Sequence, residues 1–273
     1  MEINTEYWSR LGIFLCLLLL MLLWEGLTPR RKPIEIKWQR RINNILLVIF
    51  GSFLLWCIPV SALWASIAAE DRRWGLFNIY QLPDIPELVL TLLFLDLLIY
   101  GQHVVFHKIP ALWRIHRVHH SDMDFDVTTG IRFHPVELIL SMFIKIAGII
   151  CIGASLSAVI IFEIVLNGTS MFNHGNVNIP VKLDKILRLF IVTPDMHRVH
   201  HSVIRKETDS NYGFNLPWWD RIFGTYRAQP ESGHLAMKIG LLDIIGDRAI
   251  KLGGLLVQPF IQVKNYQKNV NSY

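Results

Sequence analysis

Charged residues are scarce in this sequence. Asp, Glu, Lys and Arg make up 18% of its 273 residues, against about 25% in an average soluble domain. Hydrophobic residues make up 52%, and the mean hydropathy is positive. This composition excludes an ordinary soluble domain and predicts an integral membrane protein. The formal charge of +5 comes with no basic stripe and no nucleic-acid-binding motif, so no nucleic-acid partner is expected.

Cysteine is almost absent, and so are the cofactor motifs of redox domains. Cys16, Cys57 and Cys151 are odd in number and lie in apolar segments, which predicts buried thiols rather than disulfides or metal ligands. The sequence has no ferredoxin-type cysteine run and no G-x-G-x-x-G fingerprint of a nucleotide cofactor. Any electrons that the protein uses are therefore expected to come from another protein.

Long apolar stretches, in contrast, are frequent. A helix needs about 20 apolar residues to cross a bilayer. The candidates are residues 11–24, 42–69, 88–100 and 136–166, of which the third reaches the length of a span only if it continues to Phe106. No cleavage site of small residues follows the first stretch, so it is expected to remain as a helix and not to be removed as a signal peptide.

The fourth apolar stretch is long enough for two helices. The segment "CIGAS", with Gly153 among small residues, is predicted to form the turn of a helical hairpin. Lys145 and Glu163 then lie equally far from Ala154, at similar depth, and are expected to pair. The alternative is one longer tilted helix with Lys145 reaching the membrane surface, which would place the histidines that follow on the opposite side.

The charges of the loops predict the orientation in the membrane. Residues 28–41 hold six Lys or Arg and one acid, whereas residues 70–87 balance two Arg against four acids. The positive-inside rule places the first loop in the cytoplasm and the N-terminus outside. The third stretch then brings His103 and His107 to the cytoplasmic face of a bacterial inner membrane or of the endoplasmic reticulum. The predicted fold is all-α, with about four membrane-embedded helical segments, the fourth a hairpin, and a cytoplasmic, helical, histidine-rich cap.

Histidine is concentrated in one region, since ten of the 11 histidines lie between residues 103 and 201. The segment "HRVHHS" occurs twice, at residues 116–121 and 197–202, and "HVVFH" lies at residues 103–107. Offsets of i, i+3 and i+4 place imidazoles on one face of a helix. Three short helices are therefore predicted to bring together His103, His107, His116, His119, His120, His197, His200 and His201.

Clusters of imidazoles suit zinc, copper, iron or nickel. Eight or more ligands are too many for one ion, so the pattern predicts two metal ions close together, with positions left open for a small molecule. His134 in "RFHP" and His174 in "FNHGN" are further candidate ligands, whereas His234 is expected at the surface.

Several other segments lead to further predictions. Asp96 lies seven residues before His103 on nearly the same helical face and is a candidate catalytic residue, with a structural hydrogen bond as the alternative. Asp195 is expected to cap the helix of the last histidine group, or else to orient an imidazole. Residues 181–192 and 235–260 are predicted to form interfacial helices without a fifth span. Residues 122–126, "DMDFD", are read as a solvated acidic loop, with a hard-cation site as the alternative.

The order of these motifs resembles that of the fatty acid hydroxylase and sterol desaturase superfamily. The resemblance covers residues 85–230 and rests on the segments "HVVFH", "HRVHHS", "TTGIRFHPVE", "FNHGN", "PDMHRVHHS", "NYG" and "WDRIFGTY". It implies an integral membrane, non-haem di-iron enzyme that uses dioxygen and an external electron donor to hydroxylate or desaturate a lipid. It also implies that the eight clustered histidines, together with His174 and His134, are metal ligands.

Further expectations follow from this resemblance. The electron donor would be a separate protein, either similar to cytochrome b5 or a ferredoxin with its reductase. The lipid would be a sterol, a fatty acyl chain or an ether lipid, and the HxxxH spacing is more similar to the sterol-type and ether-lipid branches. Asn211 of "NYG" is expected to lie over the metal site and to place a water molecule or a ligand.

The predicted organisation has three parts. Residues 1–84 form N-terminal membrane helices and a basic loop, residues 85–230 the catalytic domain, and residues 231–273 an amphipathic tail. The residues alone leave two other functions open. One is a membrane zinc hydrolase, for which Glu137 is the nearest candidate general base. The other is a non-catalytic protein that binds lipid, metal or haem.

Overall fold

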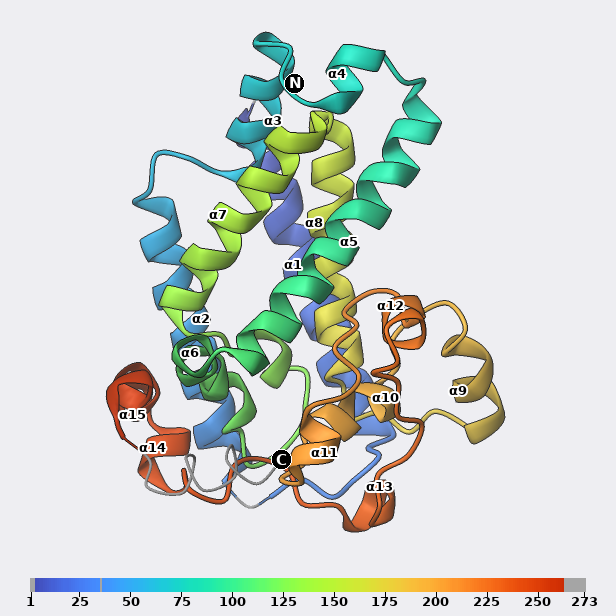
Figure 1. Ribbon diagram of the computed structural model, residues 1–273. Helices are drawn as coiled ribbons and strands as arrows, with labels where there is room; N and C mark the ends of the chain where they lie inside the picture. Colours follow the sequence, from blue (N-terminus) through green and yellow to red (C-terminus); the bar gives the residue numbers. More distant parts are fainter. Residues whose placement is uncertain (1–2, 35, 263–273) are drawn as a thin grey trace.

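Helices form all the regular structure in the computed structural model, which describes residues 3–34 and 36–262 (Figure 1). No strand occurs in these residues, as predicted. The helices that are long and apolar enough to cross a membrane are α1 (Ile3–Leu27), α5 (Asp84–Lys108), α7 (Pro135–Ile152) and α8 (Leu156–Asn173). The predicted all-α membrane architecture is therefore confirmed.

The second predicted span is not one helix. Helix α2 (Lys37–Trp56) begins inside the basic loop, the chain turns near Pro59, and α3 (Ala62–Asp71) follows. Proline disfavours the helical conformation in the residue before it and lacks a backbone donor. Ser61 then caps α3 by accepting a hydrogen bond from the Trp64 amide at 3.1 Å. The prediction of a continuous span over residues 42–69 is wrong for this reason.

Helices α7 and α8 form the predicted hairpin. Gly153 ends α7 with φ 71°, a conformation that glycine adopts without a steric penalty. A Cβ atom at this position would lie 2.6 Å from the Trp74 carbonyl oxygen. Ser155 then caps α8 by accepting from the Ala158 amide. The hairpin returns the chain to the end of the molecule that it left, so the residues before α7 and after α8 lie in the same region (Figure 1).

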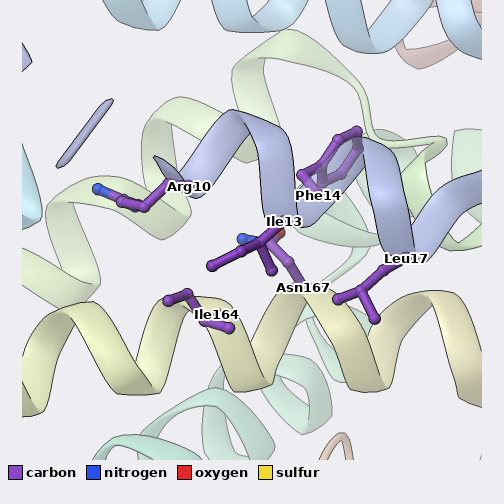
Figure 2. Close-up of a pocket in the computed structure, with 6 residues that line it drawn as sticks. All are labelled: Arg10, Ile13, Phe14, Leu17, Ile164 and Asn167. Carbon is purple, nitrogen blue, oxygen red and sulfur yellow. The ribbon is translucent and has the colours of Figure 1, made fainter. Parts of the chain in front are cut away.

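Three charged side chains meet between the long helices. Lys145 Nζ of α7 lies 2.8 Å from Glu163 Oε1 of α8, which confirms the predicted pair. Arg10 of α1 binds the other carboxylate oxygen. Figure 2 shows Arg10 beside a small cavity between α1 and α8, whose other lining residues are Ile13, Phe14, Leu17, Ile164 and Asn167. Glu163 thus ties α1 to the hairpin and partners two cations that would otherwise stand among apolar helices.

Most of the short helices gather at the end of the long helices opposite the N-terminus, where they form a cap (Figure 1). The cap consists of α6 (Pro110–His120), α9 (Val181–Leu187), α10 (Pro194–His200), α11 (Arg205–Thr208), α12 (Trp218–Ile222), α13 (Gly233–Ala236), α14 (Asp247–Ile250), α15 (Leu252–Val257) and the turns η1 (Thr129–Ile131) and η2 (Gln258–Phe260). Helix α4 (Leu76–Tyr80) lies with α3 at the other end. The basic loop belongs to the cap end, because Arg30 forms a 2.9 Å ion pair with Asp195.

Three smaller predictions need correction. The interfacial helix ends at Leu187, although the apolar side chains of Leu183, Ile186 and Phe190 are exposed, as an interfacial segment requires. Residues 235–260 form several short helices in place of one. The three cysteines are exposed and not buried, since they lie on apolar surfaces of the chain that a bilayer would cover. The division of the chain after residues 84 and 230 stays a prediction.

Because Glu163 pairs with both Arg10 and Lys145, substitution of Glu163 is expected to destabilise the fold more than substitution of Lys145. Glu163→Gln leaves two cations without a partner and is expected to destabilise the fold by about 3–5 kcal/mol. Lys145→Leu leaves the Arg10–Glu163 pair intact and is expected to destabilise the fold by only about 1 kcal/mol. Thermal unfolding of both variants in detergent measures the difference, and equal stability of the two variants would contradict the arrangement.

Candidate metal centre

Nine of the ten predicted histidine ligands converge inside the cap. All nine are buried, and they form two groups in which the candidate ligand atoms lie within 4.8 Å of one another. The five-histidine group consists of His103, His107, His116, His120 and His200. The four-histidine group consists of His119, His174, His197 and His201.

Each copy of "HRVHHS" serves both groups. The i and i+4 histidines of the first copy enter the five-histidine group, and its i+3 residue, His119, enters the other. In the second copy the i and i+4 pair enters the four-histidine group, and His200 crosses to the first. On a helix, i and i+4 lie about 40° apart and i+3 lies about 100° from i+4. Two helices that face each other can therefore share two groups, which explains why the chain contains the motif twice.

The helix ends set the positions of the histidines. His103 and His107 lie in the last turns of α5, and Pro110 starts α6 two residues after α5 ends. Helix α10 carries the second motif and is capped by Thr193, whose hydroxyl accepts from the Met196 amide at 3.3 Å. The predicted cap, Asp195, is instead paired with Arg30 and Arg198.

Five imidazoles are oriented through Nδ1. Four of these nitrogens face backbone carbonyl oxygens: His103 faces Tyr212 at 2.8 Å, His119 faces Arg132 at 3.3 Å, His174 faces Ser170 at 2.7 Å, and His200 faces Ser210 at 2.7 Å. The fifth, in His116, faces Glu137 Oε1 at 2.6 Å. An oxygen acceptor requires a protonated Nδ1, so each Nε2 keeps its lone pair.

The Nε2 atoms of these five rings and of His197 lie close to one another inside the two groups. The separations are 3.1 Å for His103–His116, 3.0 Å for His103–His200, 3.0 Å for His119–His174 and 3.1 Å for His174–His197. Lone pairs at such distances repel unless a proton or a metal ion lies between them. Burial lowers the pKa of His174 and of His200 to about 3, so neutral rings are favoured over imidazolium.

Unpartnered nitrogens point to the same chemistry. His107, His120, His197 and His201 each have a buried ring nitrogen without a hydrogen-bond partner. Buried polar atoms normally have partners, and neutral imidazole nitrogens are common ligands of transition metals. The donor set therefore fits metal ions in both groups.

The structure does not bring His134 into either group. Its Nδ1 accepts from the Val136 amide at 3.2 Å and caps α7, while Nε2 lies 3.2 Å from the Leu256 carbonyl oxygen. His234, expected at the surface, is buried, and its Nε2 lies 3.8 Å from Asp195.

Asn211 holds the segment that orients two of the histidines. Its backbone has φ 51°, and its side-chain amide donates to the carbonyl oxygens of Met196 at 2.9 Å and Arg227 at 2.8 Å. Its side-chain oxygen accepts from the Arg227 amide at 2.8 Å. The neighbouring residues Ser210 and Tyr212 carry the carbonyls that face His200 and His103. The side chain of Asn211 thus holds the backbone of this segment, and its placing of a water molecule or a ligand stays a prediction.

Two buried acids support the same segment. Asp96 accepts from the amides of Asn215 and Leu216 at 3.2 Å each and from the Trp219 indole at 2.8 Å. Asp220 accepts from the amides of Tyr212 and Gly213 at 2.8 Å each. Neither acid hydrogen-bonds to an imidazole among the described residues. Sequence reasoning missed Asp220, although it lies in the motif "WDRIFGTY".

The acidic loop beside the four-histidine group is buried, so the prediction of a solvated loop is wrong. Asp122, Asp124 and Asp126 are all buried. Arg40 of α2, which is also fully buried, binds Asp122 at 2.6 Å and Asp126. Buried carboxylates need a charged partner, and here that partner comes from a helix about 80 residues earlier in the chain. Sequence spacing alone does not reveal such a pair.

The N-terminal helices also hold the loop of His174. Glu25 of α1 accepts from the amides of Val127 at 2.6 Å and Asn176 at 2.8 Å. The side chain of Asn176 in turn bonds the backbone of Arg31. The N-terminal region is therefore part of the scaffold of the histidine groups.

Comparisons with known proteins identify the family of this chain. The fatty acid hydroxylase family matches residues 88–225, half of the chain. Ornithine lipid hydroxylase OlsE of Rhizobium tropici is 28% identical over 91% of this chain and 74% of its own length. Alkylglycerol monooxygenase of Xenopus tropicalis is 29% identical over 70% of this chain, and cholesterol 25-hydroxylase of Rattus norvegicus is 23% identical over 67%. The matches span 42% and 60% of those two relatives' own lengths. No solved structure matches the chain significantly.

His134 and His174 lie in different surroundings, so their substitution is expected to change the metal content of the protein to different extents. His174→Ala is expected to lower the bound metal, because it removes one of four ligands from its group. His134→Asn is expected to retain the parental metal content, because Asn also caps helices. Elemental analysis of the purified variants measures both, and loss of metal in His134→Asn alone would contradict the assignment.

The contacts of Asn211 predict a structural effect with a consequence for metal binding. Asn211→Ala removes three hydrogen bonds and is expected to destabilise the fold by about 2–3 kcal/mol and to weaken metal binding. Asn211→Gly loses the same bonds but adopts positive φ freely, so it should be the more stable of the two variants. Thermal unfolding and metal content check this, and parental values for both variants would contradict it.

Proposed function

The chain belongs to the fatty acid hydroxylase family and is an oxidoreductase, and from this premise we propose that it hydroxylates a membrane lipid at a pair of iron ions, with dioxygen as co-substrate and electrons from a separate protein. The observation that carries the proposal is the pair of interleaved histidine groups at one end of four apolar helices. Their nine imidazoles offer enough ligands for two ions and leave positions open.

Iron in these groups would supply the activation of dioxygen that breaking an unactivated C–H bond requires and that acid–base side chains lack. The chain's own residues orient the ligands. The carbonyls of Ser210 and Tyr212 and the carboxylate of Glu137 keep Nδ1 protonated in His200, His103 and His116, so that Nε2 faces inward. Burial of both groups excludes bulk water, which limits side reactions.

The position of the histidines supports a substrate that reacts near its polar end. His103 and His107 lie in the last turns of α5, and His174 follows α8 directly. The groups therefore lie at the ends of the apolar helices, which in a bilayer would place them near the lipid head groups. We infer that the reacting carbon belongs to the head group, the glycerol backbone or a carbon close to them. Ornithine lipids and alkylglycerols, named in two relatives, are the first candidates, before sterols and free fatty acids.

The cap and the basic loop share one end of the molecule, which supports a cytoplasmic metal site with the N-terminus outside. The electron donor would then be a cytoplasmic or membrane-bound protein, similar to cytochrome b5 or to a ferredoxin with its reductase.

The hydrolase alternative has less support. Its candidate base, Glu137, has one carboxylate oxygen bonded to His116, which is a contact that orients a ligand. A non-catalytic role would not explain why the two histidine groups leave coordination positions open for other ligands.

The proposal predicts about two irons per chain in protein purified anaerobically from iron-fed cells. A His119→Ala, His200→Ala double variant loses one ligand from each group and is expected to lose iron from both. With reductant, an electron donor and ¹⁸O₂, the parent should convert one member of a lipid panel to a product that is heavier by one labelled oxygen atom, as mass spectrometry detects.

Other results would contradict the proposal. One zinc ion per chain with oxygen-independent turnover would favour the hydrolase. Absorption in the haem region, or iron that the double variant retains, would favour the non-catalytic alternative.

A further inference from the structure

The two histidine groups differ in the carboxylates that directly contact their rings. Glu137 Oε1 lies 2.6 Å from Nδ1 of His116, and Asp209 Oδ1 lies 3.5 Å from Nδ1 of His107. Both histidines belong to the five-histidine group. Within the described part of the chain, no carboxylate oxygen lies at ion-pair distance from an imidazole of the four-histidine group.

We propose that Glu137 and Asp209 are positioning residues that make the five-histidine group the tighter metal site and leave the four-histidine group as the labile, more open one. This inference rests on the proposed function, because it assumes that both groups bind metal. It goes beyond that function by ranking the two groups in metal affinity and by adding Asp209 to the residues that orient them.

Charge compensation is the first physical reason. Neutral imidazoles leave the charge of a divalent metal ion uncompensated in a buried site. Glu137 is 3% exposed, and its second oxygen has no partner among the described residues, so its negative charge is directed at the histidine group and not spread into solvent. A carboxylate that accepts from Nδ1 also raises the basicity of the ligand and fixes the orientation of its ring.

Asp209 faces a second ring of the same group. Its Oδ2 accepts from Arg205 Nε at 2.6 Å, while its Oδ1 lies 3.5 Å from His107 Nδ1. The Nδ1 atom of His107 has no hydrogen-bond partner among the described residues, and Asp209 also interacts with the Tyr212 side chain. A metal on His107 Nε2 would strengthen the Nδ1–H donor and draw it towards Asp209 Oδ1.

The four-histidine group has no carboxylate in direct contact with its rings, because Asp122 and Asp126 near His174 are bound by Arg40. It also has one imidazole fewer, and the Nδ1 atoms of His197 and His201 have no hydrogen-bond partner, nor does that of His107 in the other group. Its rings are less constrained, and a metal there keeps more positions for exchangeable ligands. Small anions are therefore expected to exchange at this group.

Metal titration of the full chain in detergent tests the proposal. Free Zn²⁺ is set by a chelator buffer, and bound zinc per chain is measured by elemental analysis. The parent should fill in two separate steps. Glu137→Gln and Asp209→Asn should each weaken the tighter step by about 10–100-fold and leave the weaker step unchanged.

A matched control separates this effect from loss of any buried acid. Glu207 is fully buried and accepts from the Glu231 amide, and it contacts no imidazole among the described residues. Glu207→Gln should keep both steps. A second measurement uses Co²⁺ in place of Zn²⁺, and azide should change the visible spectrum only after the second equivalent is bound. Thermal unfolding verifies that each variant is folded, and Asp209→Asn carries the test if Glu137→Gln does not fold.

The possible results are distinct. Two steps that coincide in the parent, a loss of both steps together in the variants, an equal loss in Glu207→Gln, or a response to azide at the first equivalent would each overturn the inference while the proposed function stands. A parent that binds no transition metal would overturn the proposed function, and the inference with it.

Discussion

The structure depends on one electrostatic constraint, which is that nine imidazoles are buried together and six of them have Nε2 atoms 3.0–3.1 Å from one another. Such an arrangement is unfavourable without a cation. It is rigid only if the second nitrogen of each ring is held by a hydrogen-bond partner. Many features of the cap serve that second requirement. Backbone carbonyls and one carboxylate hold five Nδ1 atoms, and Asn211, Asp96 and Asp220 hold the segment that supplies two of those carbonyls.

The membrane helices also determine where the histidines lie. Helix α5 ends where its histidines are needed, and the hairpin of α7 and α8 returns the chain so that His174 meets the histidines of α6 and α10. The Arg10–Glu163–Lys145 group ties α1 to this hairpin. In addition, α1 and α2 place Glu25 and Arg40 against the loops beside the four-histidine group. Helices α1 and α2, which lie outside the region matched by the family, are thus integral to the site.

Burial explains why several polar residues differ from their first interpretation. Asp122 and Asp126 look like a solvated loop in the sequence but are partners of Arg40, because a carboxylate taken out of water needs a nearby cation. His134 is a candidate ligand in the sequence, and in the structure it lies outside both groups and caps α7. Asp195 looks like a cap but forms ion pairs, since Thr193 already occupies the capping position. In each case the residue type is compatible with both roles, and the three-dimensional neighbours select one.

The sequence by itself determined the features that depend on local periodicity. Apolar length predicted the helical membrane architecture, Gly153 predicted the hairpin, and the spacing of i, i+3 and i+4 predicted eight convergent histidines. Tertiary structure alone decided how those histidines divide into groups of five and four, and which acids and carbonyls support them. The physical reason is that a helical face is set by neighbours three or four residues away. The partners of a buried charge or ring nitrogen lie instead on other elements, as Arg40 and Asp122 do, and only the packed fold brings them together.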